Sequence, residues 1–163
     1  MAYLAYVSVL KKMKFLVDTM LGRIALWLRL FGYDTEYTQS EDDDILYRAV
    51  IQGRTILTRD VVFAAKAGKF AYLVQSEMLW DKLREIVLEF NIEPKLKLTK
   101  CPKCNGRIFE VGKNSIEFLV PKYTFLTHDK FWQCKSCKKV YWRGTHVDLA
   151  QKDILTKLRL DRE

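Results

Sequence analysis

Short hydrophobic runs alternate with amphipathic stretches along the first ninety residues of the chain. The hydrophobic runs predict strands over residues 13–17, 35–38, 54–58 and 70–74. The stretches between them predict helices over residues 19–31, 42–51, 61–67 and 77–90. Regular alternation of strands and helices is typical of an α/β fold, in which helices cover both faces of a parallel sheet.

Short polar side chains stand where three of these helices are expected to begin. Asp42 is a suitable N-cap, and the two acids after it fit the positive end of the helix dipole. Asp60 directly precedes the helix at 61–67, and Ser76 is a candidate cap for the last helix. Each of these residues therefore has a structural interpretation that stands beside any catalytic one.

The pattern divides the chain into three parts. Residues 1–12 form an N-terminal extension, residues 13–94 an α/β domain, and residues 95–163 a second module that ends in a polar helix from about Asp148. No hydrophobic run reaches the ~20 residues that span a bilayer, and no export signal is recognisable. We therefore expect a cytoplasmic protein without a membrane partner.

Composition and charge sharpen this division. The 163 residues are 49% hydrophobic and 29% charged, which argues against disorder. Residues 1–95 carry 13 Lys and Arg against 13 Asp and Glu, whereas residues 96–163 carry 15 against 7. The whole net charge of +8 therefore lies in the second module and favours a polyanionic partner. A solvated basic surface without a partner is the alternative.

All the cysteines lie in the second module, as two C-x-x-C pairs separated by 29 residues. They are Cys101, Cys104, Cys134 and Cys137. Four thiolates complete the tetrahedral shell of a structural zinc ion. The interval has room for a β-hairpin or two, as in zinc ribbons. Two disulfides are the competing interpretation, which a reducing cytoplasm disfavours.

Acidic residues recur at equivalent places in the α/β pattern. Asp18 ends the first strand, Asp42 to Asp44 open the second helix, and Asp60 follows the third strand. In a parallel sheet these positions share the edge where ligands bind. Carboxylates gathered there are suitable ligands for Mg²⁺ or Mn²⁺, ions that assist attack on a phosphodiester. The sequence thus supports metal-dependent phosphoryl chemistry.

Several motifs, in order from about Met13 to His146, resemble one known family. They are Val17–Arg23, Trp27–Arg29, Gly32–Thr35, Leu57–Asp60, Cys101–Asn105 and Val140–His146. The chain is similar to the Mut-seven C-terminal RNase domain family, in which a PIN-like domain is fused to a zinc ribbon. The resemblance implies a three-layer α/β/α domain with a parallel sheet, a small C-terminal zinc ribbon, and a metal-dependent ribonuclease that acts on RNA.

The same resemblance assigns roles to individual acids. Asp18, Asp42 and Asp60 match the family's metal-binding carboxylates, with Asp44 as an alternative to Asp42. Val62 stands where PIN domains often carry a further acid, which leaves the number of ions open. It also keeps an alternative function in view, a non-catalytic RNA-binding or ribosome-associated protein. Asp34 matches a family motif, but its place before the second strand reads as structural.

Basic and aromatic residues complete the expected site. Arg23 and Arg59 are candidates for contacts with substrate phosphates, whereas Arg29 points elsewhere and is interpreted as a surface ion pair. The second module is called the zinc module from here on, and its expected RNA contacts are Lys138, Lys139, Trp142, Arg143 and His146. Trp132 is interpreted mainly as core. PIN-like domains often pair, so a homodimer is one expectation, although the sequence marks no interface.

Overall fold

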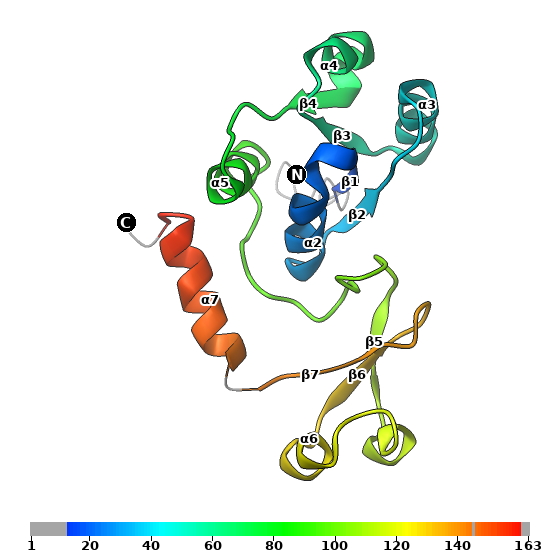
Figure 1. The fold of residues 1–163 in the computed structure, drawn as a ribbon, viewed down its shortest axis with the longest axis vertical. Helices are drawn as coiled ribbons and strands as arrows, with labels where there is room; N and C mark the ends of the chain where they lie inside the picture. Colours follow the sequence, from blue (N-terminus) through cyan, green and yellow to red (C-terminus); the bar gives the residue numbers. More distant parts are fainter. Residues whose placement is uncertain (1–12, 145, 161–163) are drawn as a thin grey trace, which may run out of the picture.

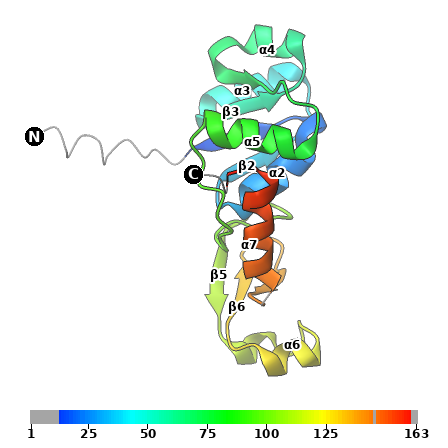
Figure 2. The same cartoon turned by 90° about the vertical axis from the view of Figure 1, so that its left-hand side faces the viewer.

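The computed structural model describes residues 13–144 and 146–160, so the extension predicted at 1–12 lies outside the described residues. Figure 1 shows two parts, an α/β domain and a smaller module built around an antiparallel sheet. The turned view shows that the molecule is long and narrow, with the α/β domain at one end (Figure 2). Of the described helices, none combines the length and the hydrophobicity needed to cross a membrane.

Four parallel strands form the sheet of the α/β domain, in the order β2-β1-β3-β4. Their bounds are β1 (Lys14–Val17), β2 (Asp34–Tyr37), β3 (Thr55–Thr58) and β4 (Ala71–Leu73). The predicted strands are therefore confirmed to within one or two residues at each end. The central strand β1 aligns Phe15 with Thr35 of β2 on one side and with Thr55 of β3 on the other.

Alternation along β1 separates two hydrophobic layers. Phe15 and Val17 pack with the layer that contains α2 (Gly22–Leu30) and α5 (Leu79–Glu89). Leu16, between them, packs with α3 (Asp42–Gln52) and α4 (Val61–Ala67) on the opposite face. All three side chains are fully buried, each worth ~1.5–3 kcal/mol in transfer free energy. The predicted three-layer α/β/α arrangement is thereby confirmed.

Two of the three predicted N-caps, Asp42 and Ser76, are wrong, and the third, Asp60, is right. The N-cap of α3 is Glu41, whose carbonyl accepts the Ile45 N–H, so Asp42 lies one residue inside the helix. The N-cap of α5 is Met78, because Glu85 holds the Ser76 backbone N–H outside the helix. Asp60 does cap α4.

The second module contains the antiparallel strands β5 (Ile108–Val111), β6 (Phe131–Cys134) and β7 (Val140–Trp142). One expected hairpin between the cysteine pairs is present as the antiparallel strands β5 and β6. Their connection is long and carries a short 3-10 helix, η3 (Lys113–Ile116), and α6 (Lys122–Thr127). Ile116 packs with Phe131 and Val140 in a small core of its own, which fixes this helical insert beneath the sheet.

The C-terminal helix α7 (His146–Lys157) returns from the zinc module to the α/β domain (Figures 1 and 2). Its Ile154, together with Leu158 just beyond it, is buried in the cluster formed by α2 and α5. Gln151 also fixes the linker, since its amide donates to the Pro94 carbonyl at 2.7 Å and accepts the Leu96 N–H at 2.7 Å. The α/β core is therefore completed by residues that follow the cysteines.

Candidate functional site

Three neighbouring strands of the sheet are each followed by one of the predicted catalytic acids. Asp18 follows β1, Asp42 opens the helix after β2, and Asp60 comes two residues after β3. Because β2, β1 and β3 are adjacent and parallel, these acids all lie at the carboxyl edge of the sheet. The fold thus brings them to one edge, as the sequence predicts.

Thr58 connects two of these acids directly. Its hydroxyl donates a hydrogen bond to Oδ2 of Asp18 and accepts the backbone N–H of Asp60 at 2.9 Å. The other oxygen of Asp18 accepts the Met20 N–H at 2.9 Å and caps the 3-10 helix η1 (Thr19–Leu21). Asp18 is only 7% exposed, so these bonds compensate the cost of burying its carboxylate.

Asp60 and the acids of α3 have structural partners of their own. Oδ1 of Asp60 accepts the Phe63 N–H at 2.8 Å, which is the expected helix cap. Asp43 pairs with Lys66 of α4 at 2.6 Å, and this bond raises the pKa of Lys66. Asp42 and Asp44 are exposed in the first turn of α3. Among the described residues, Asp43 therefore has an ion-pair partner, which distinguishes it from Asp42 and Asp44.

The three arginines named in the sequence analysis differ in how far their side chains are exposed. Arg23 is exposed in the first turn of α2, and Arg59 is half-buried, with its Nε buried and unbonded among the described atoms. Arg29 is only 9% exposed, so its interpretation as a surface ion pair is wrong. Its Nε donates to the Thr35 carbonyl at 2.8 Å and its Nη1 to the Pro102 carbonyl at 3.1 Å. Burial lowers the pKa of Arg29.

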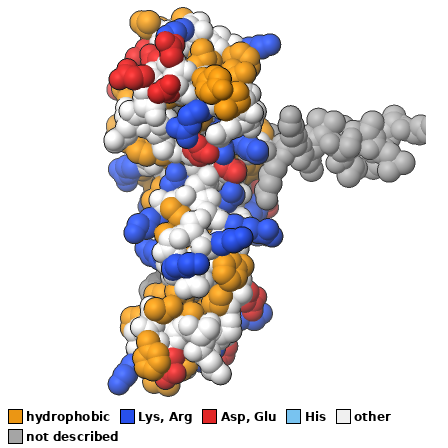
Figure 3. Space-filling view, turned by 90° about the vertical axis from the view of Figure 1, so that its right-hand side faces the viewer, with side chains coloured by type: hydrophobic (Ala, Val, Ile, Leu, Met, Phe, Trp, Pro, Cys, Tyr) orange, Lys and Arg blue, Asp and Glu red, His pale blue; other side chains and the backbone are white. Residues whose placement is uncertain are grey.

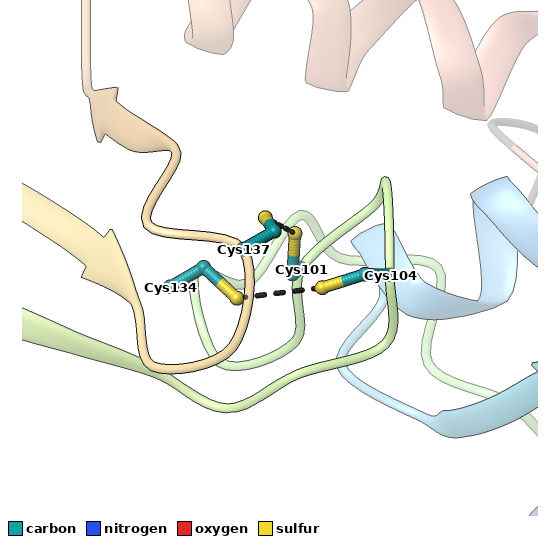
Figure 4. A group of neighbouring side chains, drawn as sticks. All are labelled: Cys101, Cys104, Cys134 and Cys137. Atoms are coloured by element: carbon teal, nitrogen blue, oxygen red, sulfur yellow. Dashed lines mark hydrogen bonds between the residues drawn. The ribbon is translucent and has the colours of Figure 1, made fainter.

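The four cysteines converge from two facing loops (Figure 4). The Sγ atoms of Cys101 and Cys137 are 3.6 Å apart, and those of Cys104 and Cys134 are 3.5 Å apart. Zinc–sulfur bonds of ~2.3 Å give sulfur–sulfur edges of about 3.8 Å in a tetrahedron. All four cysteines are free, so the disulfide alternative is wrong. Of the described residues, only these four form a group of three or more Cys, His, Asp or Glu close enough to hold one ion.

Tyr141 supports the cluster from β7. Its hydroxyl lies 2.9 Å from Sγ of Cys101, which is fully buried. Burial by itself raises the pKa of the Cys101 thiol, but hydrogen bonds from Tyr141 and Cys104 outweigh it and lower the pKa. Burial and hydrogen bonds with the neighbouring thiols raise the pKa of Cys104. Cys101 therefore lies in surroundings that favour the thiolate, which is the form that binds zinc.

The two cysteine loops repeat the same backbone turn. The residue after each second cysteine has a positive φ, 64° at Asn105 and 60° at Lys138. Each closes its loop by donating its backbone N–H to the carbonyl of the first cysteine, at 2.8 Å for Asn105 and 3.1 Å for Lys138. Gly106 lets the loops approach, because a Cβ there would lie 2.8 Å from Sγ of Cys134.

The first cysteine loop is docked on the outer edge of β2. Asn105 accepts the Thr35 N–H at 3.0 Å through its side-chain oxygen, and its amide donates to Oδ1 of Asp34 at 2.9 Å. Lys100 and Arg54 also pair with Asp34, at 3.1 and 2.8 Å. Asp34 is therefore structural, as the sequence suggests. The contacts of Asp34 were not predicted, although Asn105 and Asp34 both stand in motifs that carry the family resemblance.

A comparison with protein families places these features together. A family model described as Mut7-C RNAse domain matches residues 13–154, from the first strand into the last helix. The chain belongs to the Mut7-C RNAse domain family. No curated protein and no solved structure matches it. Membership implies a nuclease-like function with RNA as the substrate.

In this Mut7-C RNAse domain, the expected RNA contacts of the zinc module lie in different surroundings. Lys138 and Lys139 are exposed on the second cysteine loop, and the ammonium of Lys139 lies 5.8 Å from the Tyr141 ring centre. Trp142 is 37% exposed, and Arg143 is exposed beyond the end of β7. Trp132 is half-buried against the cysteine cluster, in keeping with a core role. His146 begins α7, and its side chain lies outside the described part.

Proposed function

We propose that this Mut7-C RNAse domain hydrolyses RNA phosphodiester bonds with a divalent metal ion bound at the carboxyl edge of its sheet. Asp18 and Asp60 are the ligands from β1 and β3, and Asp42 is the ligand from α3, with Asp44 as the alternative. The observation that carries the proposal is the alignment of acids behind three adjacent parallel strands, with Asp18 buried between them.

Oxygen donors at this edge are chemically suited to Mg²⁺ or Mn²⁺. Both ions prefer carboxylate oxygens and keep several water ligands. Asp42 and Asp44 are exposed side chains, and Oδ2 of Asp60 has no hydrogen-bond partner among the described residues. When bound, the ion supplies Lewis-acid activation of water and stabilises the leaving oxygen.

The residues of the chain position the reaction around that edge. The Thr58 hydroxyl fixes the carboxylate of Asp18 and the backbone of Asp60 relative to each other. Arg23, exposed in the first turn of α2, contacts a phosphate of the substrate. Arg59, beside Asp60, makes a second contact with a substrate phosphate. The burial of Asp18 keeps its orientation constant, which is the condition for reproducible alignment of substrate and water.

Basic side chains of the zinc module are proposed to hold the RNA strand. The candidates are Lys138, Lys139, Trp142, Arg143 and His146. Figure 3 shows a band of Lys and Arg across the middle of one face, between the acidic side chains of the α/β domain and the tip of the zinc module. Such a band attracts phosphates, and aromatic rings beside it stack on unpaired bases. Four reduced cysteines fit a reducing compartment such as the cytoplasm.

One observation favours a second candidate, an RNA-binding protein without catalysis. Val62, at the position where PIN domains often carry an acid, is 79% exposed. In the described part of the chain, the carboxylates at the sheet edge do not form a group tight enough to share one ion. In this alternative, the acids serve only as helix caps and ion pairs, while the basic zinc module binds RNA.

Cleavage of a labelled single-stranded RNA separates the two functions. Wild type is compared with Asp18→Asn and Asp60→Asn in Mn²⁺, in Mg²⁺ and in chelator, with Asp129→Asn as the matched control because Asp129 is 94% exposed at its side chain and lies in the zinc module. We expect cleavage by wild type and the control only, and none in chelator. Salt-sensitive RNA binding without cleavage by any protein would support the second candidate instead.

A further inference from the structure

A hollow of 610 Å³ opens beside Asp18, at the carboxyl edge of the sheet. Residues 19–24 line one side, and residues 77–79 with Lys82 line the other. The first side follows β1 directly, and the second leads from β4 into α5. Thr19 lines the hollow and directly follows Asp18, so the hollow adjoins the proposed catalytic edge of the sheet. Its size is within the ~300–1,000 Å³ of ordinary ligand pockets.

Two cations from different helices border this hollow. Arg23 comes from the first turn of α2, and Lys82 comes from the first half of α5. Within the described residues, neither side chain forms an ion pair or hydrogen bond with an acidic group. Other lysines near the sheet are paired, as Lys66 is with Asp43 and Lys100 with Asp34. Glu77 is the one acid of the lining, so the hollow carries a net positive charge.

The rim of the hollow also exposes two hydrophobic side chains. Met20 is 56% exposed and Met78 is 70% exposed, one from each wall. Exposed methionines are adaptable contacts for flat, polarisable surfaces such as nucleobases. A ligand that combines a negative charge with a flat hydrophobic group therefore suits this lining better than a simple anion does.

We propose that this hollow binds a nucleotide of the RNA strand adjacent to the cleaved bond, with Arg23 and Lys82 on its phosphate and Met20 and Met78 against its base. The inference rests on the proposed function, because that function places the strand at the carboxyl edge. It adds a subsite on the α/β domain itself, separate from the basic band of the zinc module. Lys82 becomes a substrate-binding residue.

Equilibrium binding in chelator tests this subsite without any cleavage. The probe is a fluorescent single-stranded RNA of about ten nucleotides, and its anisotropy is followed over a range of salt concentrations. Lys82→Met keeps the hydrophobic stem and removes the charge. The matched control is Lys69→Met, an exposed lysine in the 3-10 helix η2 (Gly68–Phe70), which precedes β4 and so lies at the opposite edge of the sheet.

We expect Lys82→Met to weaken binding about 3- to 10-fold and to reduce the salt dependence by ~0.7 of a counterion, as loss of one phosphate contact requires. Arg23→Met should do the same, and Lys69→Met should leave both quantities unchanged. Equal behaviour of Lys82→Met and Lys69→Met, or no binding by wild type in chelator, would overturn the subsite. Absence of metal-dependent cleavage, with the Lys82 effect intact, would refute the ribonuclease and leave the phosphate contact standing.

Discussion

The hydroxyl of Thr58 donates a hydrogen bond to the buried carboxylate of Asp18, at the junction of two central strands. Thr58→Val keeps the shape of the side chain but leaves Oδ2 of Asp18 and the Asp60 N–H without this partner. We expect a loss of ~1–3 kcal/mol in the free energy of unfolding. RNA cleavage should fall about tenfold or more, because Asp18 is no longer held in one orientation.

Thr58→Ser is the control for that change, since it retains the hydroxyl. Urea unfolding and metal-dependent cleavage are measured on both variants. If Thr58→Val cleaved RNA as fast as Thr58→Ser, the orientation of Asp18 would have no part in the reaction.

Asn105 and Lys138 offer a matched pair of substitutions, because both have a positive φ after a second cysteine. Asn105→Gly preserves the turn but removes the hydrogen bonds to Thr35 and Asp34. We expect it to lower the free energy of unfolding by about 1–3 kcal/mol, whereas Lys138→Gly should change it by less than ~0.5 kcal/mol. Thermal and urea unfolding measure both. Equal losses would mean that the turn, and not the docking of Asn105, carries the effect.

Asp34 makes the stability of the protein dependent on acid pH. Burial by itself raises the pKa of its carboxyl, but hydrogen bonds from Asn105, Arg54 and Lys100 outweigh this and hold the pKa far below its usual range. A carboxyl with a lowered pKa in the folded state stabilises above its unfolded pKa of ~3.9, and the contribution is lost as the pH falls toward the folded value. We therefore expect the free energy of unfolding of wild type to exceed that of Asp34→Asn by about 2 kcal/mol at neutral pH.

The difference between the two proteins should shrink steadily below about pH 4. Urea titrations of both, over a series of pH values, give the free energy of unfolding directly. A gap that stayed constant through this acid range would show that the charge of Asp34 contributes nothing.

Removal of one cysteine tests the metal site and its link to the sheet. Cys104→Ser should abolish stoichiometric zinc binding and unfold the zinc module, because a structural zinc site contributes ~10 kcal/mol or more to folding. Zinc is quantified by elemental analysis, and folding is followed by thermal circular dichroism. Full zinc content with an unchanged melt would contradict the four-thiolate site. Ser136→Ala, at an exposed residue of the second cysteine loop, is the control.

Local patterns predicted the α/β domain well because its signals are local. The run Phe15-Leu16-Val17 is hydrophobic on both sides, as expected of a strand covered on two faces. The helix α6 was not predicted, because its sequence lacks such a clear hydrophobic pattern. Its Tyr123 and Leu126 are both 76% exposed, so its hydrophobic residues do not follow the one-sided pattern of a packed helix.

Contacts between residues that lie far apart in the chain could not be predicted from the sequence. Helical geometry shows that Arg29 points away from Arg23. It does not show that Arg29 donates a hydrogen bond to the carbonyl of Pro102, which lies 73 residues further along the chain. The acids at the sheet edge were predicted as a group, because parallel strands end together. The connecting role of Thr58 was not, since a threonine that ends a strand has no distinctive signal. Likewise, the hollow beside Arg23 depends on Lys82, which only the fold brings near.

The return of α7 to the α/β domain has a consequence for the order of events during synthesis. Ile154 and Leu158 fill a core whose other members, such as Phe15 and Leu28, are made first. Translation proceeds from the N-terminus, so both cysteine pairs emerge from the ribosome before this core can close. The four cysteines are therefore available to a metal ion before Ile154 and Leu158 complete this core, and we expect zinc supplied during synthesis to raise the yield of folded protein.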